Sequence, residues 1–202
     1  MKLKSSIESL NQFYDKLGLV LEKDLPYLKQ AHTEIMNLWH ENFAKIKSVK
    51  LVVIGEAPLW GKRRSYIYNP QTPNTQFFYR SDLEPLLGFT PKNKTEFLKC
   101  LAELGIIIID VSPFALNDHD TKLTYKKLSN SDYLKLVTTF WEEHLDPILD
   151  KIMPQNPKFT FRYKRLKTIF GPLFEEKLDH QNIDSIHQVA GGINRSKLLS
   201  YF

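Results

Sequence analysis

The segment 50–60 reads KLVVIGEAPLW, and its pattern indicates how the chain folds. Four apolar residues, 51–54, run straight into the sequence Gly-Glu-Ala-Pro at 55–58. A short, continuous apolar run that stops at Gly and Pro is typical of a strand buried on both faces of a parallel sheet. Open α/β sheets bind ligands at the carboxyl ends of such strands. We therefore expect Glu56 to present a carboxylate at a ligand-binding edge.

A second apolar run, 106–109, ends in Asp110 and repeats this pattern. It follows a helix expected over 95–104 and closed by Gly105, so the two strands should form a right-handed, parallel βαβ unit. Because parallel strands end at the same edge, Glu56 and Asp110 are predicted to converge on one cleft. The alternative for Asp110 is a structural cap of the turn at 111–113.

The rest of the chain predicts a single domain, 1–202, in which 1–47 form an N-terminal helical cover. One helix is expected over 5–17, opened by a capping box of Ser5 and Glu8, and a second after Asp24. Further helices are expected over 81–87, 131–153 (kinked or divided at Pro147), 169–178 and at the carboxyl terminus, with strands over 158–163 and 183–189. This order predicts a three-layer α/β/α sandwich with a mainly parallel four-stranded central sheet.

Segment 57–80 is predicted to be a long irregular loop, and such loops are often functional. Basic and aromatic side chains alternate along it, a mixture that suits phosphate contacts and base stacking. The alternative is a loop pinned to the domain by its aromatics, with solvated arginines. The candidates are Lys62, Arg63, Arg64, Tyr68, Phe77 and Phe78.

Two later segments add candidate binding residues. The basic set at 158–167, which includes Arg162, could face phosphates or form a solvated edge. Near the carboxyl terminus, a turn at Gly191 and Gly192 would let a ligand approach the backbone closely, with Asn194 and Arg195 beside it.

Composition limits the partners. The net charge of +5 and a pI of about 9.1 favour a polyanion such as DNA without requiring one. Cys100 is the single cysteine, which excludes an internal disulfide or an iron–sulfur cluster held by several cysteines. The spacing around His119 fits no standard metal site. We expect a cytoplasmic monomer without cofactor, metal or membrane span.

The sequence at 55–58, placed after a buried strand, resembles the first motif of the uracil-DNA glycosylase superfamily, which reads GEAPG in one branch and GQDPY in another. The resemblance implies that Gly55, Ala57 and Pro58 contact substrate beside Glu56. A family phenylalanine downstream stacks on the flipped base, and Phe77 or Phe78 matches it best. Position 59 departs from the family, because it is Leu rather than Gly.

Later motifs of the family are changed here. The family's next strand ends in an asparagine that reads the uracil edge, where this chain has Asp110. The final family motif, HPSP, supplies a histidine that supports the departing uracil anion. The corresponding loop, 190–195, has no histidine, and His187 lies a few residues earlier. The GEAPG branch usually carries four cysteines for an iron–sulfur cluster, which this chain lacks.

The resemblance implies a DNA glycosylase that hydrolyses the N-glycosidic bond of a damaged or deaminated base, uracil or a related one, without a cofactor. Glu56 would stabilise the oxocarbenium-like sugar or orient water. An ionised Asp110 only accepts hydrogen bonds, which disfavours the uracil O4 edge unless burial keeps it protonated. Two alternatives stay open: a catalytically inactive nucleic-acid-binding relative, and a hydrolase acting on small nucleosides or nucleotides.

Overall fold

The structure is a computed structural model of the chain, and it describes residues 3–72, 86–117, 120–179, 183–186 and 194–202. Four strands form one all-parallel sheet in the order β2-β1-β3-β4. Their bounds are β1 Leu51–Gly55, β2 Ile106–Asp110, β3 Lys158–Phe161 and β4 Asp184–Ser185. The predicted four-stranded parallel sheet is confirmed. In the register of β1 and β2, Gly55 lies opposite Asp110, so the two carboxylate-bearing strand ends are neighbours.

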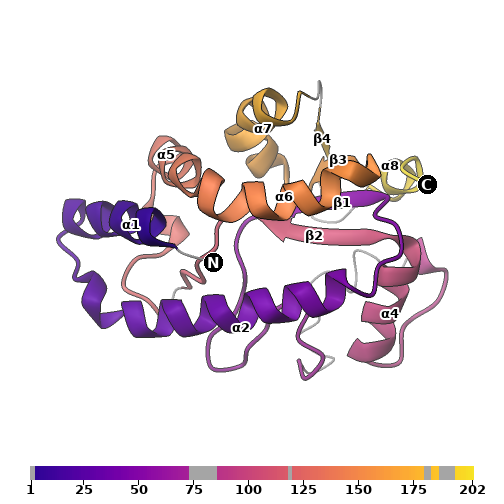
Figure 1. Ribbon diagram of the computed structural model, residues 1–202, viewed down its shortest axis with the longest axis horizontal. Helices are drawn as coiled ribbons and strands as arrows, with labels where there is room; N and C mark the ends of the chain where they lie inside the picture. Colours follow the sequence, from indigo (N-terminus) through magenta and orange to yellow (C-terminus); the bar gives the residue numbers. More distant parts are fainter. Residues whose placement is uncertain (1–2, 73–85, 118–119, 180–182, 187–193) are drawn as a thin grey trace.

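Helices lie on both sides of this sheet. In Figure 1, α2 and α4 run below the strands, and α6 and α7 lie above them. This arrangement is α/β and consistent with a three-layer sandwich. The helix bounds are α1 Lys4–Lys16, α2 Leu25–Phe43, α4 Lys94–Leu104, α5 Asn130–Phe140, α6 Asp146–Ile152, α7 Lys164–Leu178 and α8 Arg195–Leu199. Short 3₁₀ turns occur at Leu21–Lys23, Tyr125–Lys127 and Met153–Gln155.

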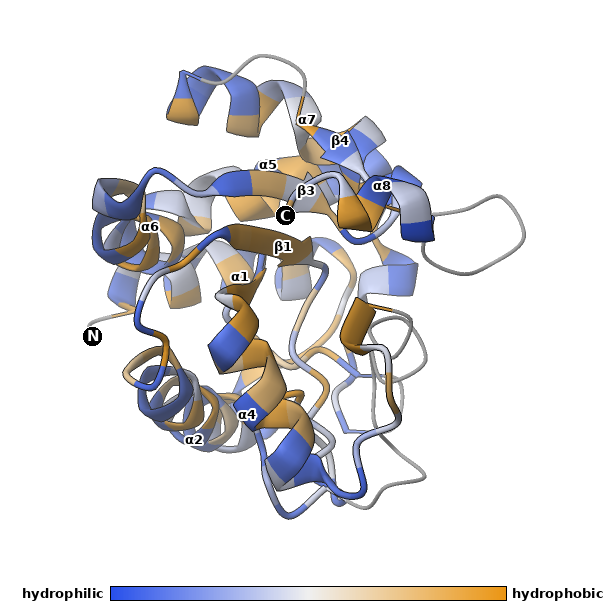
Figure 2. Cartoon of the chain, turned by 90° about the vertical axis from the view of Figure 1, so that its right-hand side faces the viewer, coloured by the Kyte–Doolittle hydropathy of each residue, from blue (hydrophilic) through white to orange (hydrophobic). Residues whose placement is uncertain are grey.

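The apolar runs and stripes of the sequence explain these layers. Every residue of β1 is buried, and Figure 2 shows the strand as uniformly hydrophobic, whereas α2 and α4 alternate between hydrophobic and hydrophilic residues. A helix with one apolar stripe packs that stripe on a sheet and leaves the other side to water. No helix in the described part of the chain is both long enough and apolar enough to span a bilayer.

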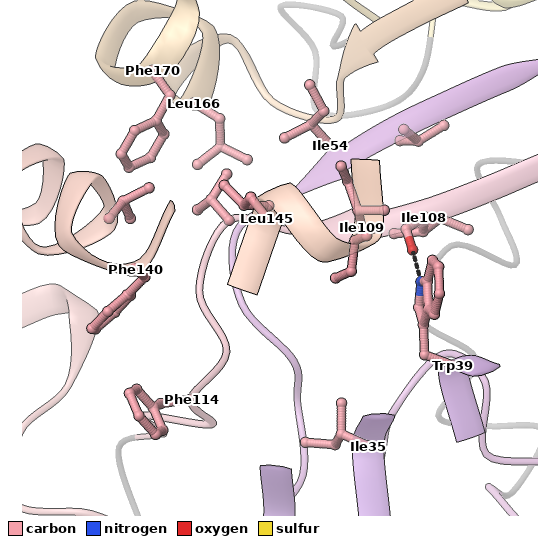
Figure 3. Packing of buried hydrophobic residues seen from close by; sticks show 14 of the residues in the cluster. Ile35, Trp39, Ile54, Ile108, Ile109, Phe114, Phe140, Leu145, Leu166 and Phe170 are labelled. Atoms are coloured by element: carbon pink, nitrogen blue, oxygen red, sulfur yellow. Dashed lines mark hydrogen bonds between the residues drawn. The ribbon is translucent and has the colours of Figure 1, made fainter. Parts of the chain in front are cut away.

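Side chains from both layers close the core around the strands. Figure 3 shows Phe114 beside Phe140, with ring centroids 5.3 Å apart, and Leu166 and Phe170 of α7 near Ile54. On the other side, the indole of Trp39 donates a 3.0 Å hydrogen bond to the carbonyl of Ile108. Such packing makes the strand ends rigid supports for the side chains they carry.

The outer side of β2 is covered by side chains. This strand stands at the edge of the sheet, so half of its peptide groups face away from β1. The backbone N–H of Ile108 donates to the hydroxyl of Tyr68 at 2.7 Å, the Ile108 carbonyl accepts from Trp39, and the Asp110 carbonyl lies 2.9 Å from Nε2 of His144. These contacts satisfy an edge that would otherwise be unpaired.

Two helix predictions need correction. The start of α1 has no capping box: its N-cap is Leu3, and the N–H groups of Ser5 and Ser6 donate instead to the Glu143 carboxylate. A carboxylate from a distant segment thus does the work expected of Ser5. The helix predicted over 131–153 is divided as expected, but before Pro147, because a π-helical turn at Trp141–Leu145 separates α5 from α6. Pro147 lies in the first turn of α6, directly after the π turn.

Other predictions hold in outline. Helix α2 begins after Asp24, and α4 begins after Asn93, whose side chain accepts from the N–H of Glu96. The N-terminal cover has two roles, because α2 reaches the sheet through Trp39 whereas α1 packs against α5. The described part of the last strand is only Asp184–Ser185. Most of the helix predicted over 81–87 lies outside the described residues.

Candidate functional site

Glu56 and Asp110 meet at the carboxyl edge of the sheet. Glu56 follows directly after β1, and Asp110 is the last residue of β2. Both line one cavity of about 350 Å³, together with Ala57 and Pro58. The predicted convergence of the two carboxylates is therefore confirmed. The volume lies within the roughly 300–1,000 Å³ of typical small-molecule sites.

The two carboxyl groups differ in their surroundings. Burial, followed by the nearby charge of Glu56, raises the pKa of Asp110 from 3.8 to about 7. Asp110 is thus substantially protonated near neutral pH. Glu56 instead forms an ion pair with Arg165, 2.5 Å from its Oε1, and its side chain is 32% exposed. Acid and base roles are divided in this way when two carboxyl groups meet different environments.

Aromatic and apolar side chains form the walls of the cavity. The aromatic ones are Tyr66, Tyr125 and Tyr163, and the apolar ones are Leu59, Ile67 and Leu116. The polar lining consists of Ser65, Asn117, Thr124 and Lys126. Flat aromatic walls with a few polar groups suit a planar heterocycle, which gains stacking on its faces and hydrogen bonds at its edge.

Hydrogen bonds hold two parts of the cavity lining in place, the ring of Tyr125 and the peptide of Glu56. The hydroxyl oxygens of Tyr125 and Ser112 lie 2.5 Å apart, and the Tyr125 hydroxyl donates to the carbonyl of Phe114, also at 2.5 Å. Burial raises the pKa of Tyr125 well above its ordinary value, so the phenol stays protonated. The Tyr133 hydroxyl donates to the carbonyl of Glu56 at 3.0 Å, and the Tyr133 ring packs against the Tyr125 ring at a tilt of 37°, with centroids 4.8 Å apart.

The loop after Glu56 is anchored to the N-terminal helices. The hydroxyl of Tyr27, on α2, accepts from the N–H of Gly61 at 3.0 Å and from the Asn117 amide at 3.5 Å. A Cβ at Gly61, whose φ is +61°, would lie 2.5 Å from a carboxylate oxygen of Asp120. The positive φ favours glycine, and any side chain here would require the Asp120 carboxylate to move. The described part of the loop is therefore pinned to the domain, as one of the two readings of this segment predicted.

The predicted basic residues fall into distinct environments. Lys62, Arg63 and Arg195 are exposed. Arg64 pairs with Glu34 at 3.3 Å and lies over the Trp60 ring.

Arg162 does not face solvent, contrary to a role in phosphate contact. It is 6% exposed and lies 4.5 Å from the centre of the Tyr163 ring, because its N–H continues the pairing of β3 with Ile54.

A smaller hollow of about 270 Å³ adjoins Glu56, lined by Tyr163 and residues 164–166, so Lys164 and Arg165 stand beside the main cavity.

Several predicted substrate contacts lie elsewhere. Tyr68 is 2% exposed and bonds the backbone of β2, so it belongs to the core and not to the cavity. Gly55 is buried within the sheet, and its carbonyl accepts from Val111. Asn194 caps α8, with its side chain accepting from the N–H of Lys197. The candidates Phe77, Phe78, His187, Gly191 and Gly192 lie outside the described residues.

Sequence patterns missed the cavity residues Asn117, Lys126 and Tyr125. Asn117 lies in a loop and the other two lie in a short 3₁₀ turn, far from the GEAP motif in the chain, and neither segment has a periodicity that the sequence reveals. The described residues contain no group of three or more His, Cys, Asp or Glu side chains arranged to hold a metal ion. Comparisons with protein-family models, curated proteins and solved structures find no match to this chain.

Proposed function

We propose that this protein is a DNA glycosylase that hydrolyses the N-glycosidic bond of a damaged or deaminated base, uracil or a related one. One observation carries the proposal: Glu56 and Asp110 stand on neighbouring strand ends in one aromatic-walled cavity, with the pKa of Asp110 raised to about 7. Paired carboxyl groups in different environments are typical of glycoside hydrolysis.

A protonated Asp110 could take the place of the asparagine that the family has at this position. A protonated carboxyl has one O–H donor and a carbonyl acceptor, the same pair of functions that an asparagine amide offers to a base edge. Near or below pH 7 this residue would therefore pair with uracil O4 and N3–H as an amide would. Above pH 7 the ionised group would only accept.

The reaction assigns one role to each carboxyl group. The bond from the sugar C1′ to the base nitrogen breaks, and its electron pair leaves with the base. The Glu56 carboxylate would stabilise the developing positive charge on the sugar and take a proton from the water whose oxygen bonds to C1′. The Asp110 O–H would donate to the departing base. The products are the free base and an abasic sugar.

DNA binding is supported by cations near the mouth. Lys126 lines the cavity, and Lys164 and Arg165 line the adjoining hollow. A flipped base would enter the cavity while its flanking phosphates meet Lys126 and Lys164. Tyr66 and Tyr163 would supply stacking faces from described parts of the chain.

A hydrolase of small nucleosides or nucleotides is the second candidate, and a specific observation favours it. Arg64 and Arg165 each pair with a carboxylate, and Arg162 is buried. Fewer arginines are thus available to contact DNA phosphates than the sequence indicated. A substrate with one phosphate or none would require fewer such contacts.

An incision assay tests the proposal. Duplex and single-stranded oligonucleotides bearing uracil, hypoxanthine, xanthine or a mismatch are incubated with protein, treated with alkali and resolved by size. We expect strand breaks with at least one base, lost in Glu56→Gln. Glu34→Gln is the matched control, because Glu34 also pairs with an arginine and is similarly exposed, at 29%. Nucleoside hydrolysis without incision of any oligonucleotide would favour the second candidate, and neither activity would refute both.

A further inference from the structure

The backbone carbonyls of both candidate catalytic residues are held by one helical segment, 130–152. Tyr133, on α5, donates its hydroxyl to the Glu56 carbonyl at 3.0 Å. His144, in the π-helical turn, has Nε2 2.9 Å from the Asp110 carbonyl oxygen. The two hydrogen-bonding side chains thus come from α5 and from the π turn that follows it, and they reach the residue after β1 and the last residue of β2.

The contact of His144 fixes its tautomer. A carbonyl oxygen only accepts, so Nε2 carries the proton and Nδ1 presents a lone pair. Nδ1 has no hydrogen-bond partner among the residues that the structure describes. Burial lowers the pKa of His144 to about 4, so the ring is neutral near pH 7. A buried, neutral imidazole whose one N–H donates a hydrogen bond to a backbone carbonyl orients that peptide and does not carry protons.

The π turn matters because it interrupts the regular helix where His144 must point at the sheet. Single π turns within helices are rare and are found frequently at functional sites. Here the turn ends at Leu145, and α6 restarts the regular pattern directly after it. His144 is 4% exposed and Tyr133 is fully buried, so neither side chain is free to serve another partner in solvent.

We infer that Tyr133 and His144 are positioning residues that together set the separation of the Glu56 and Asp110 carboxyl groups across the cavity. Their meaning for catalysis rests on the proposed function, whereas their effect on the carboxyl pair does not. Each bond fixes the peptide that carries the carboxyl group, after the end of the central strand β1 for Glu56 and at the end of the edge strand β2 for Asp110. Loss of either bond lets that strand end relax and the two carboxyl groups move apart or become hydrated.

The Asp110 titration reports this separation, because the charge of Glu56 contributes to the raised pKa of Asp110. Other ionisable groups around the pair are Tyr68 and Tyr125 from the loops, Tyr133 from α5, Arg165 from α7, and His32 from α2, which acts on His144. Near pH 7, burial keeps these tyrosines protonated and leaves His32 and His144 neutral, because it raises the pKa of each tyrosine and lowers the pKa of each histidine to about 4. The charge change followed near pH 7 is therefore that of Asp110.

Carbon NMR of the Asp110 carboxyl measures the effect without any substrate. Tyr133→Phe and His144→Leu each remove one bond and are expected to lower the Asp110 titration midpoint by about one pH unit. His144→Gln keeps an amide N–H near the position of Nε2 and should restore most of the shift. The matched controls are Tyr14→Phe, which removes a buried hydroxyl bonded to Asp24, and His32→Leu, which removes a second buried histidine. Both should leave the midpoint unchanged.

Equal midpoints in wild type, Tyr133→Phe and His144→Leu would overturn the inference, as would equal shifts in the two controls. If His144→Leu does not fold, nitrogen NMR of the wild-type ring decides: a proton on Nε2 is expected, and a proton on Nδ1 refutes the contact. Where base release is measurable, kcat should fall at least about tenfold in Tyr133→Phe with little change in KM. A shifted titration in a protein without glycosylase activity would refute the proposed function alone.

Discussion

Replacing Asp110 by asparagine should stabilise the protein, and by an amount that depends on pH. In the folded chain the pKa of Asp110 is about 7, against an ordinary value of 3.8. Between these values the unfolded chain has lost a proton that the folded chain keeps. Stability contributed by this group is therefore full below pH 3.8, falls as the pH rises to 7, and is flat above it. Asparagine has the same shape and no such term.

The magnitude follows from the size of the shift. Between pH 5 and pH 7 the ionisation of Asp110 lowers the wild-type free energy of unfolding by about 1.4 kcal/mol per pH unit. The free energy of unfolding of Asp110→Asn, relative to wild type, should therefore rise by about 3 kcal/mol from pH 5 to pH 8. Urea unfolding at the two pH values measures this gain. Asp150→Asn is the control, because Asp150 is an exposed carboxylate on α6. A gain that is the same at pH 5 and pH 8 would show that Asp110 is not held protonated beside Glu56.

Three further predictions concern the surroundings of the site. Arg165→Ala should change the free energy of unfolding by less than about 1 kcal/mol, because the ion pair with Glu56 is partly exposed; a larger loss in urea unfolding would contradict this. Partial burial raises the pKa of Asp184, but hydrogen bonds from Lys197 and Lys167 outweigh it and lower the pKa to about 2. The Asp184 carboxylate therefore stabilises the fold fully above pH 3.8, and this stabilisation is lost as the pH falls towards 2. Thermal melts of Asp184→Asn should thus differ from wild type at pH 6 and approach it near pH 2. Gly105→Ala should cost about 2–4 kcal/mol, because φ is +72° and the new Cβ would lie 2.3 Å from the Ser48 carbonyl oxygen; Gly18→Ala, with φ +64° and open space, should cost only about 1 kcal/mol by the same assay.

The strand pair that carries the site could be predicted from sequence because its signal is local. Apolar runs 51–54 and 106–109 admit no solvent-facing residue, and a parallel pair must end at one edge. The convergence of Glu56 and Asp110 follows from those two facts alone. The two later strands were predicted less completely, because β3 ends at Phe161, before the predicted end at 163, and the described part of β4 is only Asp184–Ser185.

The remainder of the site depends on contacts between distant segments. Tyr68 was expected at the ligand and instead satisfies an outward N–H of β2, a need visible only once β2 is known to be an edge strand. Arg162 was expected to be solvated, but its position extends β3 along β1 and turns its side chain inward. His144 lies in a π turn, and no periodicity of the sequence distinguishes such a turn from a continuous helix. Side chains whose positions depend on tertiary hydrogen bonds produce no recognisable pattern in the sequence.

Single-turnover release of free base tests the central claim most directly. Protein in excess over a uracil-bearing or related oligonucleotide is quenched at intervals, and the free base is quantified by chromatography from about pH 5 to pH 9. We expect release that slows above an inflection near pH 7, where Asp110 ionises, and that falls at least about a hundredfold in Glu56→Gln. Release that is independent of pH across this range, or equally fast in Glu56→Gln, would contradict the assignment of this carboxyl pair to the chemistry.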